Sequence, residues 1–96
     1  MHIISKKRLK EFWEQHPASR GPLEAWFTIV RATRYEMWGD LKKTFPTADK
    51  VGAKTVFNIG GNKYRLIAAV HFNRGKIYIR GVLTHEEYDQ EKWKND

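Results

Sequence analysis

The chain of 96 residues contains no cysteine. Disulfide bonds, cysteine-ligated zinc sites and thiol nucleophiles are therefore excluded, and the sequence suits a reducing cytoplasm. The histidines, His2, His16, His71 and His85, are spaced too widely for a local metal-binding motif, and no HExxH pattern occurs. We therefore expect a protein that uses neither a metal ion nor any other cofactor.

Long apolar segments are also missing. No run approaches the roughly 20 residues of a membrane span, and the N-terminus lacks the apolar stretch of a signal peptide. A chain of this length can bury one core, so we expect a single domain over residues 1–96. These features predict a cytoplasmic protein that is not bound to a membrane.

Acidic residues are scarce relative to basic ones. Eighteen Lys and Arg residues stand against eleven Asp and Glu residues, which gives a net charge of +7. Such a charge attracts polyanions over long distances and through counterion release, so nucleic acid is the first candidate partner. Because a basic surface can also serve solubility alone, the arrangement of the cations must decide.

The N-terminal half has mainly helical periodicity. A short strand is expected over residues 1–4, followed by a helix that ends at Pro17, a second helix that starts after Ser19, and a short third helix that ends at Pro46. Aromatic residues at this spacing are far more often core than a platform for stacked bases, so we interpret these helices as packing elements. The residues that carry the pattern are Leu9, Phe12, Trp13 and His16, then Leu23, Trp26, Phe27 and Val30, then Trp38, Leu41 and Phe45.

The C-terminal half predicts a small antiparallel sheet with two hairpins. A two-residue turn at Gly60-Gly61 pairs Phe57 with Tyr64, and a second such turn at residues 74–75 pairs Ala69 with Arg80. The stretch before the sheet, from Thr47 to Gly52, is expected to be a polar loop.

Both hairpins divide the strands into an apolar and a cationic face. Leu83 falls on the apolar face, whereas Arg65, Arg80 and Val82 fall on the opposite one. A bulge at residues 74–75 would instead turn Arg80 toward the core. The expected fold is therefore α+β, with the N-terminal helices packed on the apolar face of a twisted antiparallel sheet.

A capping box marks the start of a short C-terminal helix. Thr84 and Glu87 have the required spacing, so His85 becomes the first helical residue, with Tyr88 and Asp89 three and four positions further on. The positive end of the helix dipole and the neighbouring arginines favour a neutral imidazole at this position.

These residue types suit the cleavage of RNA without a metal. The ribose 2′-hydroxyl is a built-in nucleophile, so the reaction needs a base, an acid and cations on the phosphorane. We expect Arg65 and Arg80 to hold the phosphate, His85 to act as base or acid, and Tyr88 to stack on a base or orient the scissile group. An ordinary exposed position at a helix start is the competing interpretation of His85. Further candidate phosphate contacts are Arg31, Arg34, Lys42, Lys43, Lys50 and Lys54.

The motifs also resemble those of a known family. They read Val56-Phe57-Asn58-x-Gly60-Gly61-Asn62-x-x-Arg65, then Tyr78-x-Arg80, then Thr84-His85-x-Glu87-Tyr88-Asp89. This string strongly resembles the HigB-type toxins of bacterial type II toxin-antitoxin systems, while the N-terminal half matches only in length, helix content and the opening residues 1–4. The resemblance implies the RelE-like superfamily, whose small α+β proteins enter the ribosomal A site and cut mRNA there.

The resemblance implies partners and site residues as well. Such toxins are held inactive by a cognate HigA-like antitoxin with a helix-turn-helix, and the complex binds operator DNA through the antitoxin. The matching positions are Asn62, Arg65, Arg80, His85 and Tyr88; because some superfamily members use lysine in place of histidine, Lys54 and Lys63 remain candidates. Two alternatives stay open: a non-catalytic module that binds RNA or the ribosome, and a co-repressor that acts only when bound to the antitoxin.

Overall fold

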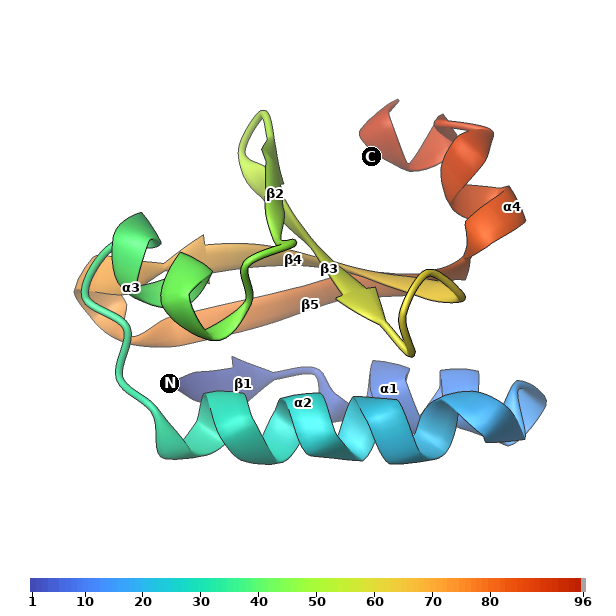
Figure 1. The fold of residues 1–96 in the computed structure, drawn as a ribbon, viewed down its shortest axis with the longest axis horizontal. Helices are drawn as coiled ribbons and strands as arrows, with labels where there is room; N and C mark the ends of the chain where they lie inside the picture. Colours follow the sequence, from blue (N-terminus) through green and yellow to red (C-terminus); the bar gives the residue numbers. More distant parts are fainter. Residues whose placement is uncertain (96) are drawn as a thin grey trace.

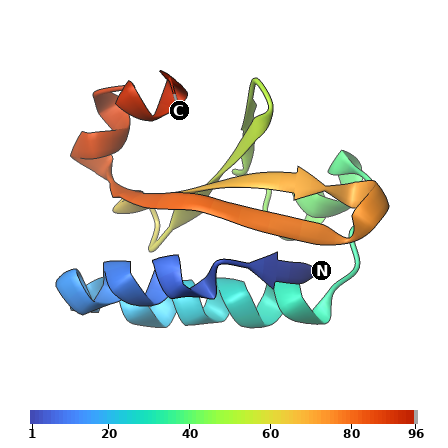
Figure 2. The ribbon, with the colours of Figure 1, turned by 180° about the vertical axis from the view of Figure 1, so that it is seen from behind.

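Helices cover one face of a five-stranded sheet in this computed structural model, which describes residues 1–95 but not the side chain of Asn95 (Figure 1, Figure 2). This α+β architecture confirms the predicted fold class. The elements in chain order are β1 (His2–Ile4), α1 (Lys6–Gln15), η1 (Pro17–Ser19), α2 (Arg20–Ala32), α3 (Trp38–Thr44), β2 (Asp49–Val51), β3 (Lys54–Ile59), β4 (Tyr64–His71), η2 (Phe72–Arg74), β5 (Lys76–Thr84), α4 (His85–Asp89) and η3 (Lys92–Asn95).

The sheet is mixed, with the strand order β1-β5-β4-β3-β2. The predicted N-terminal strand exists at one edge, but it pairs with β5 in parallel, so the expectation of a purely antiparallel sheet was wrong. Parallel strands need a long crossover connection, and the helices that follow β1 are part of the connection that leads to β5. The predicted polar loop before the sheet was also partly wrong, because Asp49–Val51 pair with β3 as an additional edge strand.

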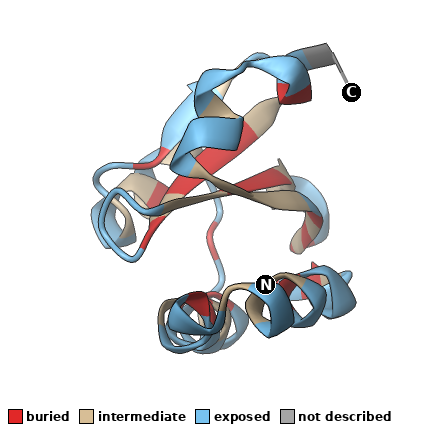
Figure 3. Cartoon of the chain, turned by 90° about the vertical axis from the view of Figure 1, so that its right-hand side faces the viewer, coloured by how far each residue is buried: buried red, intermediate tan, exposed pale blue. Residues whose placement is uncertain are grey.

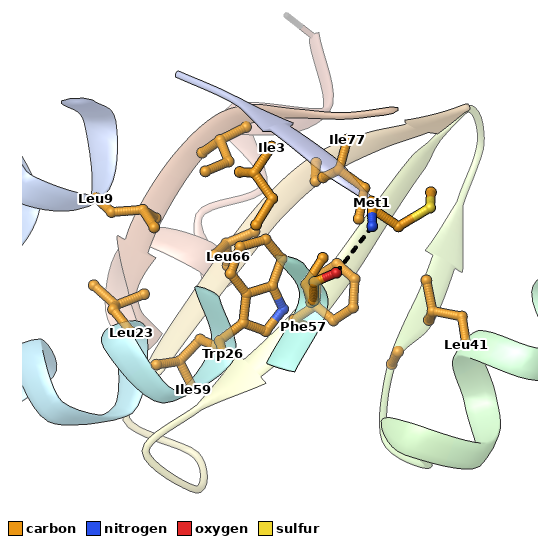
Figure 4. Packing of buried hydrophobic residues seen from close by; sticks show 14 of the residues in the cluster. Met1, Ile3, Leu9, Leu23, Trp26, Leu41, Phe57, Ile59, Leu66 and Ile77 are labelled. Carbon is orange, nitrogen blue, oxygen red and sulfur yellow. Dashed lines mark hydrogen bonds between the residues drawn. The ribbon is translucent and has the colours of Figure 1, made fainter. Parts of the chain in front are cut away.

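The main core lies between the sheet and the helices α1 and α2. Leu9, Leu23 and Leu66 are fully buried there, and the Trp26 ring meets Phe57 edge to face at 5.3 Å (Figure 4). The α-amino group of Met1 donates hydrogen bonds to carbonyl oxygens at the end of α2, and burial, followed by the charge of Arg34, lowers its pKa below 8.0. The predicted helical stripes are therefore confirmed in part: their buried members are Leu9, Leu23, Trp26, Val30 and Leu41, whereas their other aromatic residues are only partly buried against the core and His16 does not belong to it.

The turn between β3 and β4 is two residues longer than predicted. Residues 60–63 form the connection, so Phe57 pairs with Leu66 and not with Tyr64. Gly60 and Gly61 have φ angles of 62° and 69°, which glycine adopts at little cost. Because the register shifts by two residues, the side chains of β3 and β4 stay on their predicted faces of the sheet.

The second hairpin contains a β-bulge that the sequence did not predict. Its connection runs over residues 72–75, and Ala69 pairs with Tyr78 rather than with Arg80. Ala68 pairs with Ile79 and Ile67 with Gly81, so Arg80 is the extra residue of β5. No bulge lies at residues 74–75, and Arg80 stays exposed, as predicted.

The bulge exchanges the faces of the residues that follow it. Val82 packs against the main core, whereas Leu83 joins a second hydrophobic cluster with Val56, Ile67 and Trp93 on the other face of the sheet. The predicted placement of Val82 and Leu83 was therefore reversed, because an extra residue shifts the two-residue alternation of a strand.

Burial follows this two-faced arrangement. The sheet strands carry more buried residues than the helices do, and the outer surfaces of α1 and α2 are exposed (Figure 3). Within residues 1–95, no helix has the length and apolar character needed to span a bilayer.

Arg34 packs into the turn between β4 and β5. Its Nη2 donates to the carbonyl oxygen of Phe72 at 2.9 Å, and its Nε lies 3.2 Å from a carboxylate oxygen of Glu36. A Cβ atom added to Gly75, which has a φ of 66°, would overlap with this guanidinium. Gly75 therefore provides both the left-handed turn and the space for Arg34.

We predict that Gly75→Ala destabilises the protein more than Gly52→Ala. Both glycines have positive φ angles, but nothing lies within 4 Å of an added Cβ at Gly52. Gly52→Ala should cost only the backbone strain, about 1 kcal/mol, and Gly75→Ala about 1 kcal/mol more through displaced Arg34 hydrogen bonds. Urea unfolding measures both values; equal losses would show that the turn accommodates Arg34 elsewhere.

Candidate functional site

A groove opens on the sheet face that α1 and α2 do not cover. It has a volume of about 560 Å³, and three of its lining residues are cations, whereas none is acidic. We call it the sheet groove. It is lined by Arg8, Ala53, Lys54, Ile67, Ala69, Arg80, Gly81, Leu83 and Trp93.

The bulge places Arg80 at the edge of this groove. Because Arg80 has no partner in the β4–β5 register, its carbonyl oxygen is available, and Nη1 of Arg8 donates to it at 2.9 Å. The Arg80 guanidinium is exposed and lies 5.9 Å from the centre of the Tyr78 ring. Two arginines from distant parts of the chain thus meet at one edge of the groove.

The C-terminal turn η3 forms the other side of the groove. The Trp93 side chain is only 6% exposed and packs on Val56 and Ile67. Nζ of Lys54 donates to the carbonyl oxygen of Trp93 at 2.8 Å, so the lysine also fixes this turn. The apolar surface that β3 and β4 present on this face is therefore partly covered by the chain itself.

Tyr88 connects the C-terminal turn with Arg65. The Trp93 ring stacks on the Tyr88 ring with centroids 5.0 Å apart, and the Arg65 guanidinium lies 5.4 Å from the Tyr88 ring centre. Nε1 of Trp93 also donates to the carbonyl oxygen of Tyr88 at 3.0 Å. Because Trp93 covers one face of this ring, a base cannot stack on that face in this arrangement.

The capping box at the start of α4 is confirmed. The Glu87 amide donates to Oγ1 of Thr84 at 3.2 Å, and the Thr84 amide donates to the Glu87 carboxylate at 2.9 Å. The His85 amide in turn donates to the carbonyl oxygen of Lys63 at 3.0 Å, which ties α4 to the β3–β4 turn. The position of His85 is therefore fixed by backbone contacts on both sides.

The imidazole of His85 is paired with a carboxylate. Its Nδ1 lies 2.9 Å from Oδ2 of Asp89, one helical turn further on, and both side chains are about half exposed. A carboxylate that accepts from Nδ1 orients the ring and leaves Nε2 as the nitrogen that the carboxylate does not engage.

The predicted site residues fall into two groups on the sheet face. Lys54 and Arg80 belong to the sheet groove, while Arg65, His85 and Tyr88 gather at α4. Trp93 joins the groups, because it lines the groove and stacks on Tyr88. Asn62 and Lys63 are exposed in the turn beside His85.

The remaining predicted RNA contacts lie outside these groups. Arg34 holds the β4–β5 turn, and Nζ of Lys42 donates to the carbonyl oxygens of Pro46 and Ala48 at 2.7 and 2.9 Å. Arg31 and Lys43 are exposed on α2 and α3. Arg34 and Lys42 therefore make hydrogen bonds within the protein itself.

Sequence reasoning missed two residues of the sheet groove, Arg8 and Trp93. Arg8 looks like one more solvated cation on α1, and only its contact with the Arg80 carbonyl gives it a role. Trp93 lies beyond the last recognisable motif, in a segment of otherwise polar residues. Because tryptophan is highly buried on average, its presence there could have indicated that the C-terminal segment packs on the protein.

Metal ligands do not gather in the part of the chain that the structure describes. Across residues 1–95, no three His, Cys, Asp or Glu side chains are close enough together to hold an ion.

Comparison with known proteins gives a consistent family. Residues 19–91 match the family model of HigB_toxin, described as the RelE-like toxic component of a toxin-antitoxin system. The chain is 38% identical over 92 residues to the "mRNA interferase toxin HigB" of Escherichia coli strain K12, which covers 93% of this chain and 88% of the relative. It is 27% identical over 93 residues to the "mRNA interferase HigB" of Escherichia coli O6:H1, covering 94% and 90%.

We predict that Trp93→Ala loosens α4 and destabilises the protein. The substitution removes the stack on Tyr88 and the cover over Val56 and Ile67, at a cost of roughly 3 kcal/mol. Urea unfolding followed by circular dichroism measures this loss. Lys92→Ala, at an exposed neighbouring position, is the control and should change little; a similarly small effect of Trp93→Ala would contradict the anchoring role.

Proposed function

The chain belongs to the HigB family of RelE-like toxins of toxin-antitoxin systems, and from this premise we propose that it is an endoribonuclease that cuts mRNA across its open sheet face. The observation that carries the proposal is a cationic groove without acidic residues next to an imidazole that is held by a carboxylate. In this proposal residues 1–96 are one toxin domain that acts in the cytoplasm.

The cations of the sheet groove bind the RNA backbone. Arg80 offers an exposed guanidinium, and Arg8 and Lys54 add positive charge on either side of the groove. A guanidinium donates two parallel hydrogen bonds to a phosphate, and these bonds strengthen as charge develops on the phosphorane. Since no lining residue is acidic, the groove does not repel the phosphate.

Proton transfer falls to His85. Asp89 holds Nδ1, so Nε2 takes the proton of the 2′-hydroxyl or gives one to the leaving 5′-oxygen. In the first step the 2′-oxygen attacks phosphorus and the bond to the 5′-oxygen breaks, which yields a 2′,3′-cyclic phosphate and a 5′-hydroxyl. The reaction needs no metal, because the nucleophile is part of the RNA.

The residues around α4 position the substrate. Asn62 and Lys63 are exposed beside His85 and contact the RNA backbone near the scissile bond. Arg65 contributes charge, while Tyr88 supports both Arg65 and Trp93 and acts as a positioning residue rather than as a stacking platform. Of the remaining cations, Lys43 is available for peripheral phosphate contacts.

The ribosome and an antitoxin complete the proposed system. The site is shallow and half exposed, so we expect the ribosomal A site to hold the mRNA in the reactive geometry. A cognate antitoxin with a helix-turn-helix neutralises the toxin, and operator DNA is bound only through that complex.

A second candidate is a ribosome-binding module that blocks translation without cleavage. It is favoured by one observation: none of the residues that line the sheet groove is a histidine or an acid. Mapping of transcript ends after induction separates the two functions, because only the nuclease creates new ends within codons.

We predict that Arg80→Ala and His85→Ala relieve the growth arrest caused by the wild-type protein. Loss of the phosphate-binding guanidinium should lower cleavage about 100-fold, and loss of the imidazole about 100-fold or more. Arg74→Ala, an exposed arginine in the distant β4–β5 turn, is the matched control and should remain toxic. Undiminished arrest by both site variants, with normal circular dichroism spectra, would remove these residues from the mechanism.

We also predict the chemical requirements of the reaction. A single 2′-deoxy substitution at the scissile nucleotide should abolish cleavage at that bond, whereas a chelator should leave the rate of the purified protein unchanged. Ribosomes programmed with the mRNA should accelerate cleavage by orders of magnitude over free RNA. Gel analysis of end-labelled RNA tests all three, and cleavage of the 2′-deoxy substrate would refute the proposed nucleophile.

A further inference from the structure

A second groove lies between α1 and α2 on the solvent side of the helical layer. It has a volume of about 550 Å³, and five of its nine lining residues are Lys or Arg, whereas only Glu24 is acidic. We call it the helix groove. It is lined by Lys6, Lys7, Lys10, Trp13, Arg20, Glu24, Phe27, Thr28 and Arg31.

The two grooves lie on different sides of the molecule. The helices α1 and α2 lie on one side of the sheet, and α4 with the C-terminal turn lies on the other (Figure 1, Figure 2). Leu23, Trp26 and Val30 bury the sheet-facing side of α2, so the helix groove opens away from the sheet. A molecule bound there does not touch the residues that we assign to RNA cleavage.

The cations of the helix groove rest on its aromatic residues. Nζ of Lys6 lies 4.5 Å from the centre of the Phe27 ring, and the Arg31 guanidinium lies 5.8 Å from it. The Arg20 guanidinium lies 5.5 Å from the Trp13 ring. These contacts hold the charged groups in place while their outer N–H bonds stay available to an anion.

This arrangement suits a protein ligand better than RNA. Binding of single-stranded RNA relies on stacking of bases on aromatic faces, and here the faces of Trp13 and Phe27 carry the protein's own cations. Carboxylate side chains can pair with the same cations without displacing them. The partly buried rings leave an apolar floor for one or two aliphatic side chains.

The groove also has the dimensions of a helix-binding site. From Arg20 to Arg31 the lining residues of α2 extend over roughly 16 Å, which equals about three turns of a helix laid alongside. Its only hydroxyl belongs to Thr28, and Glu24 is paired with Arg20, so the lining provides binding contacts rather than a nucleophile or a base.

We propose that the helix groove is a docking surface for an acidic, amphipathic helix of a partner protein. The partner's carboxylates pair with Lys6, Lys10 and Arg31, and its apolar side faces Trp13 and Phe27. A toxin of this family has a protein partner, so the occupant rests on the family assignment but not on the RNA chemistry. The proposal moves Arg31 from RNA binding to protein binding.

A peptide titration tests this surface. The probe is a 14-residue acetylated peptide with leucines at i, i+4 and i+7, glutamates at the positions that flank them and alanines elsewhere to favour a helix, added to the ¹⁵N-labelled full chain. Saturable shifts should centre on Lys6, Lys10, Trp13 and Phe27 and should weaken with added salt. The same peptide with glutamine in place of glutamate should bind at least tenfold more weakly.

Matched variants make the test specific. Lys6→Glu combined with Lys10→Glu should weaken the peptide at least tenfold, and Lys6→Gln combined with Lys10→Gln gives the same test if charge reversal disturbs α1. The control, Arg74→Glu combined with Lys92→Glu, removes the same charge at exposed positions outside the groove and should stay within twofold of wild type.

Two results would overturn the proposal. One is a peptide that shifts only the resonances of sheet-groove residues, or that binds wild type and all variants with equal affinity. The other is a 2′-O-methyl RNA of ten nucleotides that binds the helix groove more tightly than the peptide does, which would make this surface an RNA contact. The RNA-cleavage assay on the wild-type protein is a separate readout, so failure of the nuclease assignment is recognised independently of peptide binding.

Discussion

The extra residue at Arg80 is the constraint on which the site side of the structure depends. Before it, Ile77 and Ile79 point into the main core; after it, Val82 does, and Leu83 turns to the opposite face. The unpaired carbonyl at the bulge accepts the hydrogen bond of Arg8, which links α1 to the strand. The bulge thus places Arg80 at the edge of the sheet groove, brings Arg8 against its carbonyl oxygen, and turns Leu83 into the second hydrophobic cluster.

The second cluster explains why the position of α4 depends on the sheet. Val56, Ile67 and Leu83 receive Trp93, and Trp93 stacks on Tyr88 of the short helix α4. A helix of five residues is too short to be stable alone, so tertiary packing and the capping box must hold it. The position of His85 therefore depends on contacts made by Trp93, Tyr88 and the capping box.

Two surfaces of different chemistry gather positive charge on this protein. In the sheet groove the cations surround small and aliphatic side chains together with Trp93, and no lining residue is acidic. In the helix groove they lie over aromatic rings and include one ion pair. A net charge of +7 predicts attraction to anions, but only the surroundings of each cation distinguish a phosphate from a carboxylate partner.

The sequence by itself determined the local features: the amphipathic helices, the capping box at Thr84, the strands other than β2, and the motifs from Val56 to Asp89 that resemble the family. These depend on spacing within a few residues, which a sequence displays directly. Only the tertiary structure decided the position of the bulge, the pairing of Arg8 with the Arg80 carbonyl, 72 positions away, and the cover that Trp93 gives Tyr88. The physical reason is that a bulge, and a contact between distant parts of the chain, depend on the close packing of side chains on both faces of the sheet. A local sequence pattern does not specify that packing.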